Sequence, residues 1–324
     1  MKFSLVLQSL LIPAIATVVA CSSAPKAWDE SAPIDTQAEA YIQDKNGDDF
    51  KDVKKVVIPY FQMEFVVKSS ASATAFSESG NSATAAQMFQ LSGVTDEQMQ
   101  TMTDRFYDNL VAQLKKQGHT VVPHADLLKM KSFQAFEKFH KPTPHLEERN
   151  ASTSKFFSYK GMPTYFVDGD QRLSVSNALG SAFSFGKRPA ALEEDIEKES
   201  GAKVLRARYV VDFVSQAGST NGNMASVDAN YQVAMAPQFT SVTVPSEGIL
   251  IHLKAPLFTT STSWVKSVNE MNAGSNRAIS GVTALLGSTR STHEYIIETE
   301  APVWDASVSK MVAVTQQLFF SKMK

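Results

Sequence analysis

Serine–lysine pairs with the spacing that serine acyl-enzymes use include Ser152 with Lys155 and Ser307 with Lys310. In that chemistry the lysine takes the proton of the hydroxyl, and the serine oxygen attacks a carbonyl carbon. The chain contains neither a Lys-Thr-Gly triplet nor a Gly-x-Ser-x-Gly elbow, and in a serine-rich sequence a Ser-x-x-Lys spacing arises easily by chance. A lipid-anchored serine hydrolase, with Ser152 or Ser307 as its nucleophile, is therefore an alternative and not the main prediction.

The residue types that bind metals do not form a complete ligand set. Residues 44–49 resemble the opening of a calcium loop, but Asp49 stands where the loop needs glycine and Lys55 where it needs a bidentate glutamate. The histidines show no i,i+4 pair and have no cysteine partners for zinc. They are His119, His124, His140, His145, His252 and His293. The glycine-punctuated stretch 180–186 lacks the context of a phosphate loop. No metal or cofactor is predicted.

The chemistry best supported by the sequence is lipidation of Cys21. Residues 3–20 form a mostly apolar stretch after Lys2, which is typical of a signal peptide and short for a membrane-spanning helix. Residues 18–21, Val-Val-Ala-Cys, resemble the bacterial lipobox. That resemblance implies cleavage before Cys21, diacylglycerol on its thiol and acylation of the new amine. Two or three acyl chains hold a protein on a bilayer far more firmly than one.

Composition narrows the function further. The 31 basic and 33 acidic residues give a formal net charge of −2, and no basic run marks a nucleic-acid site. With a single cysteine the chain forms no internal disulfide. Its 324 residues, 43% of them hydrophobic, suffice for a large core. The exported part must therefore be held together by packing alone.

The mature chain divides into a tether and a domain. Residues 21–52 are rich in Ala, Ser, Pro, Asp and Lys without sustained periodicity, which predicts a lipidated N-terminus and flexible tether that carries one short helix around Thr36 to Ile42. One extracytoplasmic domain is predicted over 53–324. Its β-branched and aromatic stretch 54–67 predicts a long strand, in which Pro59 marks a bend or an edge position. Residues 69–90 alternate small and polar types, which fits a hairpin or a flexible loop.

The clearest helix is predicted over 95–117. Thr95 and Gln98 make a capping box, apolar residues recur every three or four positions, and Gly118 follows the last turn. Strands are predicted over 119–123, 203–214, 231–244, 248–257 and 293–299, and helices over 125–130 and 304–322. The predicted fold class is mixed α/β (α+β): a single domain with a mixed sheet, a long amphipathic helix near its start and a C-terminal helix.

The lipobox, the strand with Pro59, the helix that ends at Gly118 and the C-terminal helix form an order that resembles two families. These are the envelope lipoproteins related to the curli-secretion channel and the N-terminal domain of the TolB family. The resemblance covers residues 53–128 and 203–322. It implies a periplasmic domain held at the outer membrane, often oligomeric, that serves assembly or secretion and not catalysis.

Two predictions of function follow. The main one is an envelope lipoprotein, anchored in the outer membrane through Cys21, that binds an envelope protein or its own copies in assembly or secretion. An oligomeric secretion pore is an alternative, in which residues 69–90 insert as a membrane hairpin. The face that such a hairpin would turn to lipid is mainly alanine and has no aromatic girdle, so a tethered domain is favoured.

Overall fold

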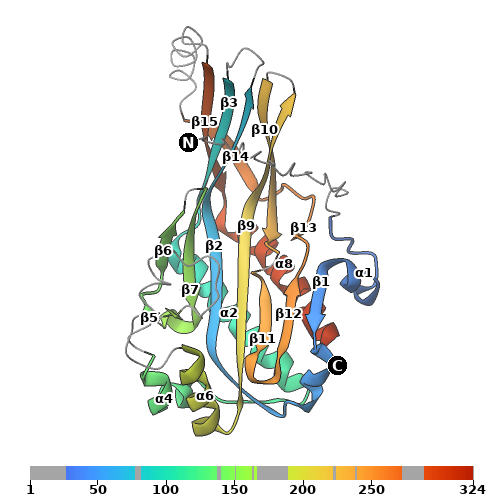
Figure 1. The fold of residues 1–324 in the computed structure, drawn as a ribbon, viewed down its shortest axis with the longest axis vertical. Coiled ribbons are helices and arrows are strands. Elements are labelled where there is room, and N and C mark those ends of the chain that lie inside the picture. The colour runs from blue at the N-terminus through green and yellow to red at the C-terminus, as the bar shows by residue number, and fades with distance from the viewer. Residues whose placement is uncertain are drawn as a thin grey trace, which may run out of the picture.

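The computed structural model describes residues 27–76, 82–136, 140–149, 151–162, 164–165, 189–221, 224–237, 239–271 and 288–323. Within them a 13-stranded mixed sheet is flanked by helices, and β5 (His140–Lys141) pairs separately with β8 (Thr164–Tyr165) (Figure 1). The predicted mixed α+β fold with a C-terminal helix is confirmed.

The main path of the 13-stranded sheet contains eight strands, and their order in the sheet differs from their order in the sequence. That order is β1 (Ile42–Lys45), β12 (Ile249–Leu253), β11 (Ser241–Val244), β9 (Lys203–Asn221), β2 (Lys55–Phe76), β3 (Ser82–Ser92), β15 (Ser288–Thr299) and β14 (Val265–Glu270). Five strands lie off this path: β10 (Met224–Met235), β13 (Leu257–Phe258), β4 (Thr120–Val121), β6 (His145–Glu148) and β7 (Ser152–Ser158). The pairs β2–β9 and β3–β15 are parallel, so the sheet joins segments that are far apart in the chain.

Strand β2 is the longest element of the sheet. The predicted strand over 54–67 is present and continues to Phe76. Pro59 lies where the register between β2 and β9 shifts, between Val57 and Tyr60. Because proline has no N–H to give to a ladder, it is accommodated at this irregularity.

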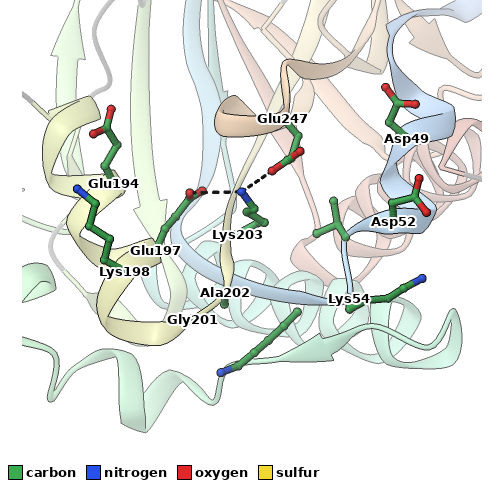
Figure 2. A pocket seen from close by; sticks show the side chains of 12 residues that line it. Asp49, Asp52, Lys54, Glu194, Glu197, Lys198, Gly201, Ala202, Lys203 and Glu247 are labelled. Carbon is green, nitrogen blue, oxygen red and sulfur yellow. Dashed lines mark ion pairs between the residues drawn. The ribbon is translucent and has the colours of Figure 1, made fainter.

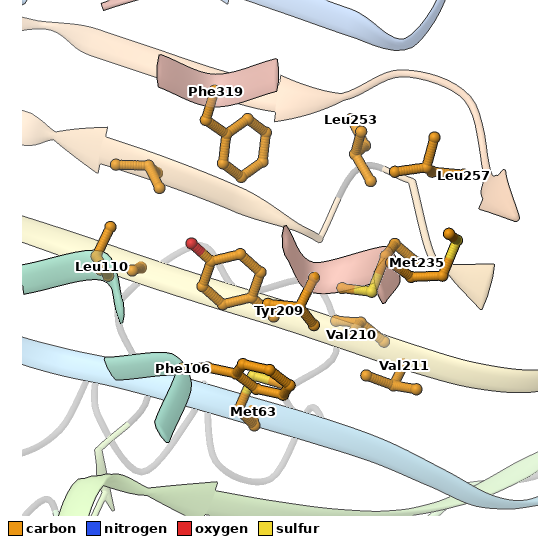
Figure 3. Close-up of a cluster of buried hydrophobic side chains, with 14 of the residues drawn as sticks. Met63, Phe106, Leu110, Tyr209, Val210, Val211, Met235, Leu253, Leu257 and Phe319 are labelled. Atoms are coloured by element: carbon orange, nitrogen blue, oxygen red, sulfur yellow. The ribbon is translucent and has the colours of Figure 1, made fainter. Parts of the chain in front are cut away.

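Two helices cover one face of the sheet. The helix predicted over 95–117 is α2 (Asp96–Lys116), with the capping box of Thr95 and Gln98 formed, and the C-terminal helix is α8 (Ala301–Lys322). Figure 3 shows Tyr209 of β9 in the core beneath them, with Phe106 of α2 and Phe319 of α8. Alternate residues of β2 reach the same core.

A smaller cluster lies under α4 (Lys131–Gln134) and α6 (Pro189–Ser200), at the lower end of the sheet in Figure 1. It contains Val57, Tyr60, Phe133, Phe136, Leu192 and Ile196. The short helix predicted over 125–130 is α3 (His124–Leu127), which contributes Leu127 to this cluster. The sheet is thus packed on both faces in its lower half.

Of the tether predicted over 21–52, the short helix is confirmed, but the described part from Trp28 on packs into the domain and is not a flexible tether. After Trp28 the chain forms α1 (Ile34–Tyr41), β1 and the 3-10 helix η1 (Gly47–Asp52), and β1 pairs with β12. Trp28, Tyr41, Ile42 and Phe50 are buried in the main core. These large side chains stand too far apart in the sequence to form a periodic pattern, yet each has a place against α8 or the sheet. Residues 21–26 lie outside the described residues.

Several strands extend beyond their predicted limits or divide. Residues 69–90 form a hairpin and not a flexible loop, since β2 pairs antiparallel with β3 from Lys68–Gln90 to Phe76–Ser82. Its predicted turn at 79–81 lies outside the described residues. The strand predicted over 203–214 continues to Asn221, and that predicted over 231–244 is two strands, β10 and β11. Ser, Ala, Gly and Asn continue these strands, and their low strand propensity hid the extensions.

Candidate interaction surface

Two hairpins project from the helix-covered part of the molecule. Figure 1 shows the upper ends of β2, β3, β9, β10 and β15 rising beyond the helices, with β15 paired in parallel with β3. We call the residues 69–76, 82–89, 215–221 and 224–231 the strand arm. The hairpins β2–β3 and β9–β10 pair antiparallel up to Phe76–Ser82 and Asn221–Met224. The arm is therefore built from two segments about 140 residues apart in the sequence.

The two hairpins of the strand arm stack closely because their facing side chains are small. Gln216 Nε2 donates a hydrogen bond of 3.0 Å to Ser69 Oγ, so Ser69 faces β9. Alternate residues of a strand share a face, which places Ala71, Ala73 and Ala75 toward β9 as well. A Cβ added at Gly218 would lie 3.0 Å from the oxygen of Ser72 and 3.1 Å from Cβ of Ala73. Glycine at this position permits the close approach of the strands.

The outer faces of the strand arm are polar and nearly free of charge. The hydroxyls of Thr74 and Thr84 lie 3.0 Å apart across β2 and β3, and those of Ser219 and Ser226 lie 2.7 Å apart across β9 and β10. Asp228 is the single charged residue in the four segments of the arm. A strand face that lies against hydrocarbon is apolar, so these outer faces fit water or another polar chain.

One edge of the strand arm is open. The amide of Ser70 donates to the carbonyl of Ala151 at 2.7 Å, just beyond the last β2–β7 pair, Ser69–Ser152. Because peptide groups alternate in direction along a strand, the N–H and C=O groups of Ser72 and Thr74 point to the same edge. Within the described residues no strand forms a ladder with this edge above Ser70, although Gly218 of β9 lies close to the carbonyl oxygen of Ser72. Natural edge strands usually carry lysine, proline or a bulge that prevents pairing, and residues 71–76 carry no lysine or proline.

A charged hollow lies at the opposite end of the molecule. It has a volume of about 720 Å³ between η1, α6 and the start of β9 (Figure 2). Lys203 pairs there with Glu247 and lies 4.0 Å from Glu197. The hydrogen bond to Glu247 raises the pKa of Lys203, and burial opposes this less strongly. Carboxylates and lysines alternate around the hollow, so its charges largely neutralise one another and select no ligand class.

A buried ionic cluster lies in the middle of the sheet. Glu64 of β2 is fully buried and accepts hydrogen bonds from Arg149 at 3.2 Å and Arg208 at 2.9 Å. The guanidinium of Arg208 also lies over the ring of Phe239. Two cations on one carboxylate favour its charged form, which suits a structural link between β2, β9 and the loop after β6 better than proton transfer.

Neither predicted serine–lysine pair is assembled. Ser152 and Lys155 lie three positions apart on β7, so their side chains point to opposite faces, and Lys155 pairs with Asp96 at 2.5 Å. On α8 the hydroxyl of Ser307 donates to the carbonyl of Val303. Lys310 pairs with Glu30. Each lysine is therefore engaged by a carboxylate and does not contact its serine.

Residues 44–49, which resemble the opening of a calcium loop, pass from β1 into η1. The histidines are dispersed. His119 contacts the carbonyl of Val53, and His293 pairs with Glu270 at 2.7 Å. In the part of the chain that the structure describes, no three His, Cys, Asp or Glu side chains gather as a metal would require. Residues 180–186 lie outside that part.

Cys21 also lies outside the described residues, so its lipidation stays a prediction. No helix within the described ranges is both long and apolar enough to cross a membrane. Comparisons with protein-family models, with curated proteins and with solved structures gave no match. The resemblance to the curli-secretion and TolB families therefore rests on the sequence.

The open edge of β2 is the feature that the sequence reading missed. The signal was present, because an uncharged Ser-Ala-Thr run directly follows a long apolar strand. Which edge of the sheet stays open depends on where β7 stops pairing, and this pairing between distant segments is set by the tertiary fold.

Proposed function

We propose that this chain is an envelope lipoprotein, anchored to the outer membrane by lipid on Cys21, that serves assembly or secretion by binding a strand of another protein. The observation that carries the proposal is the open, uncharged edge of β2 in the strand arm. Such an edge offers a row of backbone donors and acceptors to an incoming strand, which is the basis of recognition by strand addition. The lipobox supports the anchor, and neither serine–lysine pair is arranged for catalysis.

The partner is another envelope protein or a second copy of this chain. The pore alternative would require the alanine faces of the hairpins to lie against lipid. In this structure those faces pack against each other around Gly218. Strand addition at the edge of β2 does not require the alanine faces to leave each other, and we therefore favour it.

The edge can be tested at Ser72. Ser72→Pro removes an N–H that points to the open edge, and because it does not face β3, the β2–β3 ladder keeps its bonds. Ser72→Ala removes the hydroxyl but keeps the N–H and is the matched control. A photo-crosslinking amino acid at Thr74, which lies on the same edge, reports the partner in cells, and mass spectrometry of the adduct identifies it.

We expect a defined adduct from Thr74 that persists with Ser72→Ala and falls about tenfold with Ser72→Pro, since one backbone hydrogen bond is lost and the proline ring obstructs the incoming strand. An adduct with an unmodified copy of this chain would identify self-assembly. Equal adduct yields in the two variants, or none above that from an exposed position such as Leu146, would contradict binding at this edge.

The anchor is tested separately. The intact mass of the native protein should show a chain that starts at Cys21 with acyl groups, and Cys21→Ala should remove this mass and release the protein from the membrane fraction. A chain without lipid would remove the anchor from the proposal.

A further inference from the structure

The tips of the strand arm carry the most exposed large apolar side chains of the described residues. Phe76, at the end of β2, is 73% exposed, and Met224, at the start of β10, is 67% exposed. Each belongs to the last pair of its hairpin, Phe76 with Ser82 and Met224 with Asn221. Two stacked hairpins therefore end at the same level with one large apolar side chain each.

The side chains at the tips differ from those on the outer faces below them, and this difference indicates which surface the tips contact. Below them the outer faces are mostly serine, threonine and alanine, with Met88 (40% exposed) as a further apolar side chain, and the most exposed large apolar side chains stand at the end of the arm. The sequence between the strands includes one carboxylate, Glu78, which disfavours deep burial. An apolar tip beside polar residues fits the boundary between lipid headgroups and acyl chains.

The number of residues between Cys21 and Trp28 limits how far the lipid can lie from the described part of the domain. The amide of Trp28 donates to the carbonyl of Phe258, and Phe258 pairs with Ala234 of β10. From Ala234 the strand rises ten residues to Met224, about 33 Å. The seven residue steps from Cys21 to Trp28 span at most about 24 Å. A stretched tether thus brings the lipid on Cys21 to within about 10 Å of the level of the tips, a gap that the lipid linkage and the thickness of the headgroup layer can cover.

We infer that the strand arm points toward the bilayer and that Phe76 and Met224 enter its headgroup region as a second, reversible contact beside the lipid anchor. This inference rests on the proposed lipidation of Cys21. The two contacts together fix the orientation of the arm, and they leave the open edge of β2 running along the membrane normal, where a partner strand in the periplasm reaches it.

A tryptophan reporter tests the contact. Trp28, Trp264 and Trp304 are buried, so Phe76→Trp adds one exposed indole at the tip. The matched control is Leu146→Trp, because Leu146 is 51% exposed on β6, in the helix-covered part of the molecule. Both lipidated variants are placed on phosphatidylethanolamine–phosphatidylglycerol vesicles that contain lipids brominated near the headgroup. We expect strong quenching and a blue shift for Phe76→Trp and little change for Leu146→Trp.

Changing the length of the tether gives a second, independent test. Removing residues 24–26 shortens the reach by about 10 Å and should abolish the quenching at position 76, whereas inserting three residues there should preserve it. In the domain without lipid, Phe76→Ser combined with Met224→Ser should lower vesicle partitioning on the order of tenfold, because two apolar side chains lose their burial. Since both side chains are exposed, the double variant should fold like the parent.

The outcomes separate the two proposals. Acylated protein on vesicles with equal quenching at positions 76 and 146 would overturn the tip contact and leave the anchor intact. A blue shift at position 76 in detergent without vesicles, in a larger assembly, would show that a second copy covers the tips and would overturn the membrane contact. A mature chain without acyl mass overturns both.

Discussion

Strand β2 passes through two regions that are built on different principles. In the helix-covered region, residues 56–66 are buried on both faces, and large side chains such as Phe65 pack against Phe157 and Trp304 with ring centres 5.7 Å away. In the strand arm the same strand continues with serine, alanine and threonine, and it packs on the second hairpin at a distance that only glycine and alanine allow. One strand therefore serves as core in one half and as a surface for contact in the other.

The difference concerns stability as well as shape. Burial of large apolar side chains supplies most of the free energy of folding, and the stacked alanines of the arm supply little of it. The order of the strand arm must therefore depend on the helix-covered region of the molecule. A region held in this way is free to exchange its few contacts for those of a partner strand or a membrane surface.

The largest effect is expected from truncation of Phe65, with the same change at Phe76 further along β2 as the comparison. Phe65→Ala should lower the free energy of unfolding by about 3–5 kcal/mol, because Phe65 is fully buried between two aromatic rings. Phe76→Ala, the same change eleven residues further along, should stay within about 0.5 kcal/mol. Urea unfolding followed by circular dichroism measures both. Similar losses at the two positions would mean that the arm is part of the core.

A smaller effect is expected where the hairpins meet. Gly218→Val adds a branched side chain against Ser72 and Ala73 and should cost about 1–3 kcal/mol, since the strands must separate. Its neighbour Ala217 faces outward and is exposed, so Ala217→Val is the control and should be nearly neutral. Hydrogen exchange should show faster exchange confined to β2, β3, β9 and β10 above Ser69 for Gly218→Val. Protection that is unchanged in these strands would contradict the stacking of the hairpins.

The parts of the fold that could be predicted are those with a dense local signal. The helix of α2 was predicted because a capping box, a 3–4 spacing and a terminal glycine agree over 23 residues. The core half of β2 was predicted by its β-branched and aromatic run. The buried segment from Trp28 to Phe50 was missed because single large residues separated by polar ones give no period, and only the completed sheet shows that β1 has a place beside β12.

The candidate surface could be predicted only in part. Residues 69–90 suggested a hairpin, but the second hairpin of the arm was missed, because 215–221 and 224–230 combine Ser, Ala, Gly and Asn, which also occur in loops. The open edge was beyond reach, since it depends on where β7 stops pairing with β2. Pairing partners that are far apart in the chain leave no local trace in a single sequence.

The smallest expected effect uses pH to separate the two regions. Burial lowers the pKa of His252 on β12 and of His124 on α3, with Lys160 adding to the second shift, whereas the described segments of the arm contain no histidine. A histidine whose pKa is lower in the folded state takes up protons more readily when unfolded, so its contribution to stability is present above about pH 6.5 and is lost as the pH falls.

We therefore expect the helix-covered region to lose stability between pH 7 and pH 5. His252→Gln should reduce that loss and should leave the free energy of unfolding above pH 7.5 unchanged. Hydrogen exchange at the two pH values, corrected for the intrinsic rate, should show the change first in β11 and β12. The strand arm should respond only as far as its order depends on the helix-covered region, because its four segments contain no histidine. Loss of protection in the arm alone would mean that the arm, and not the buried histidines, carries the pH response.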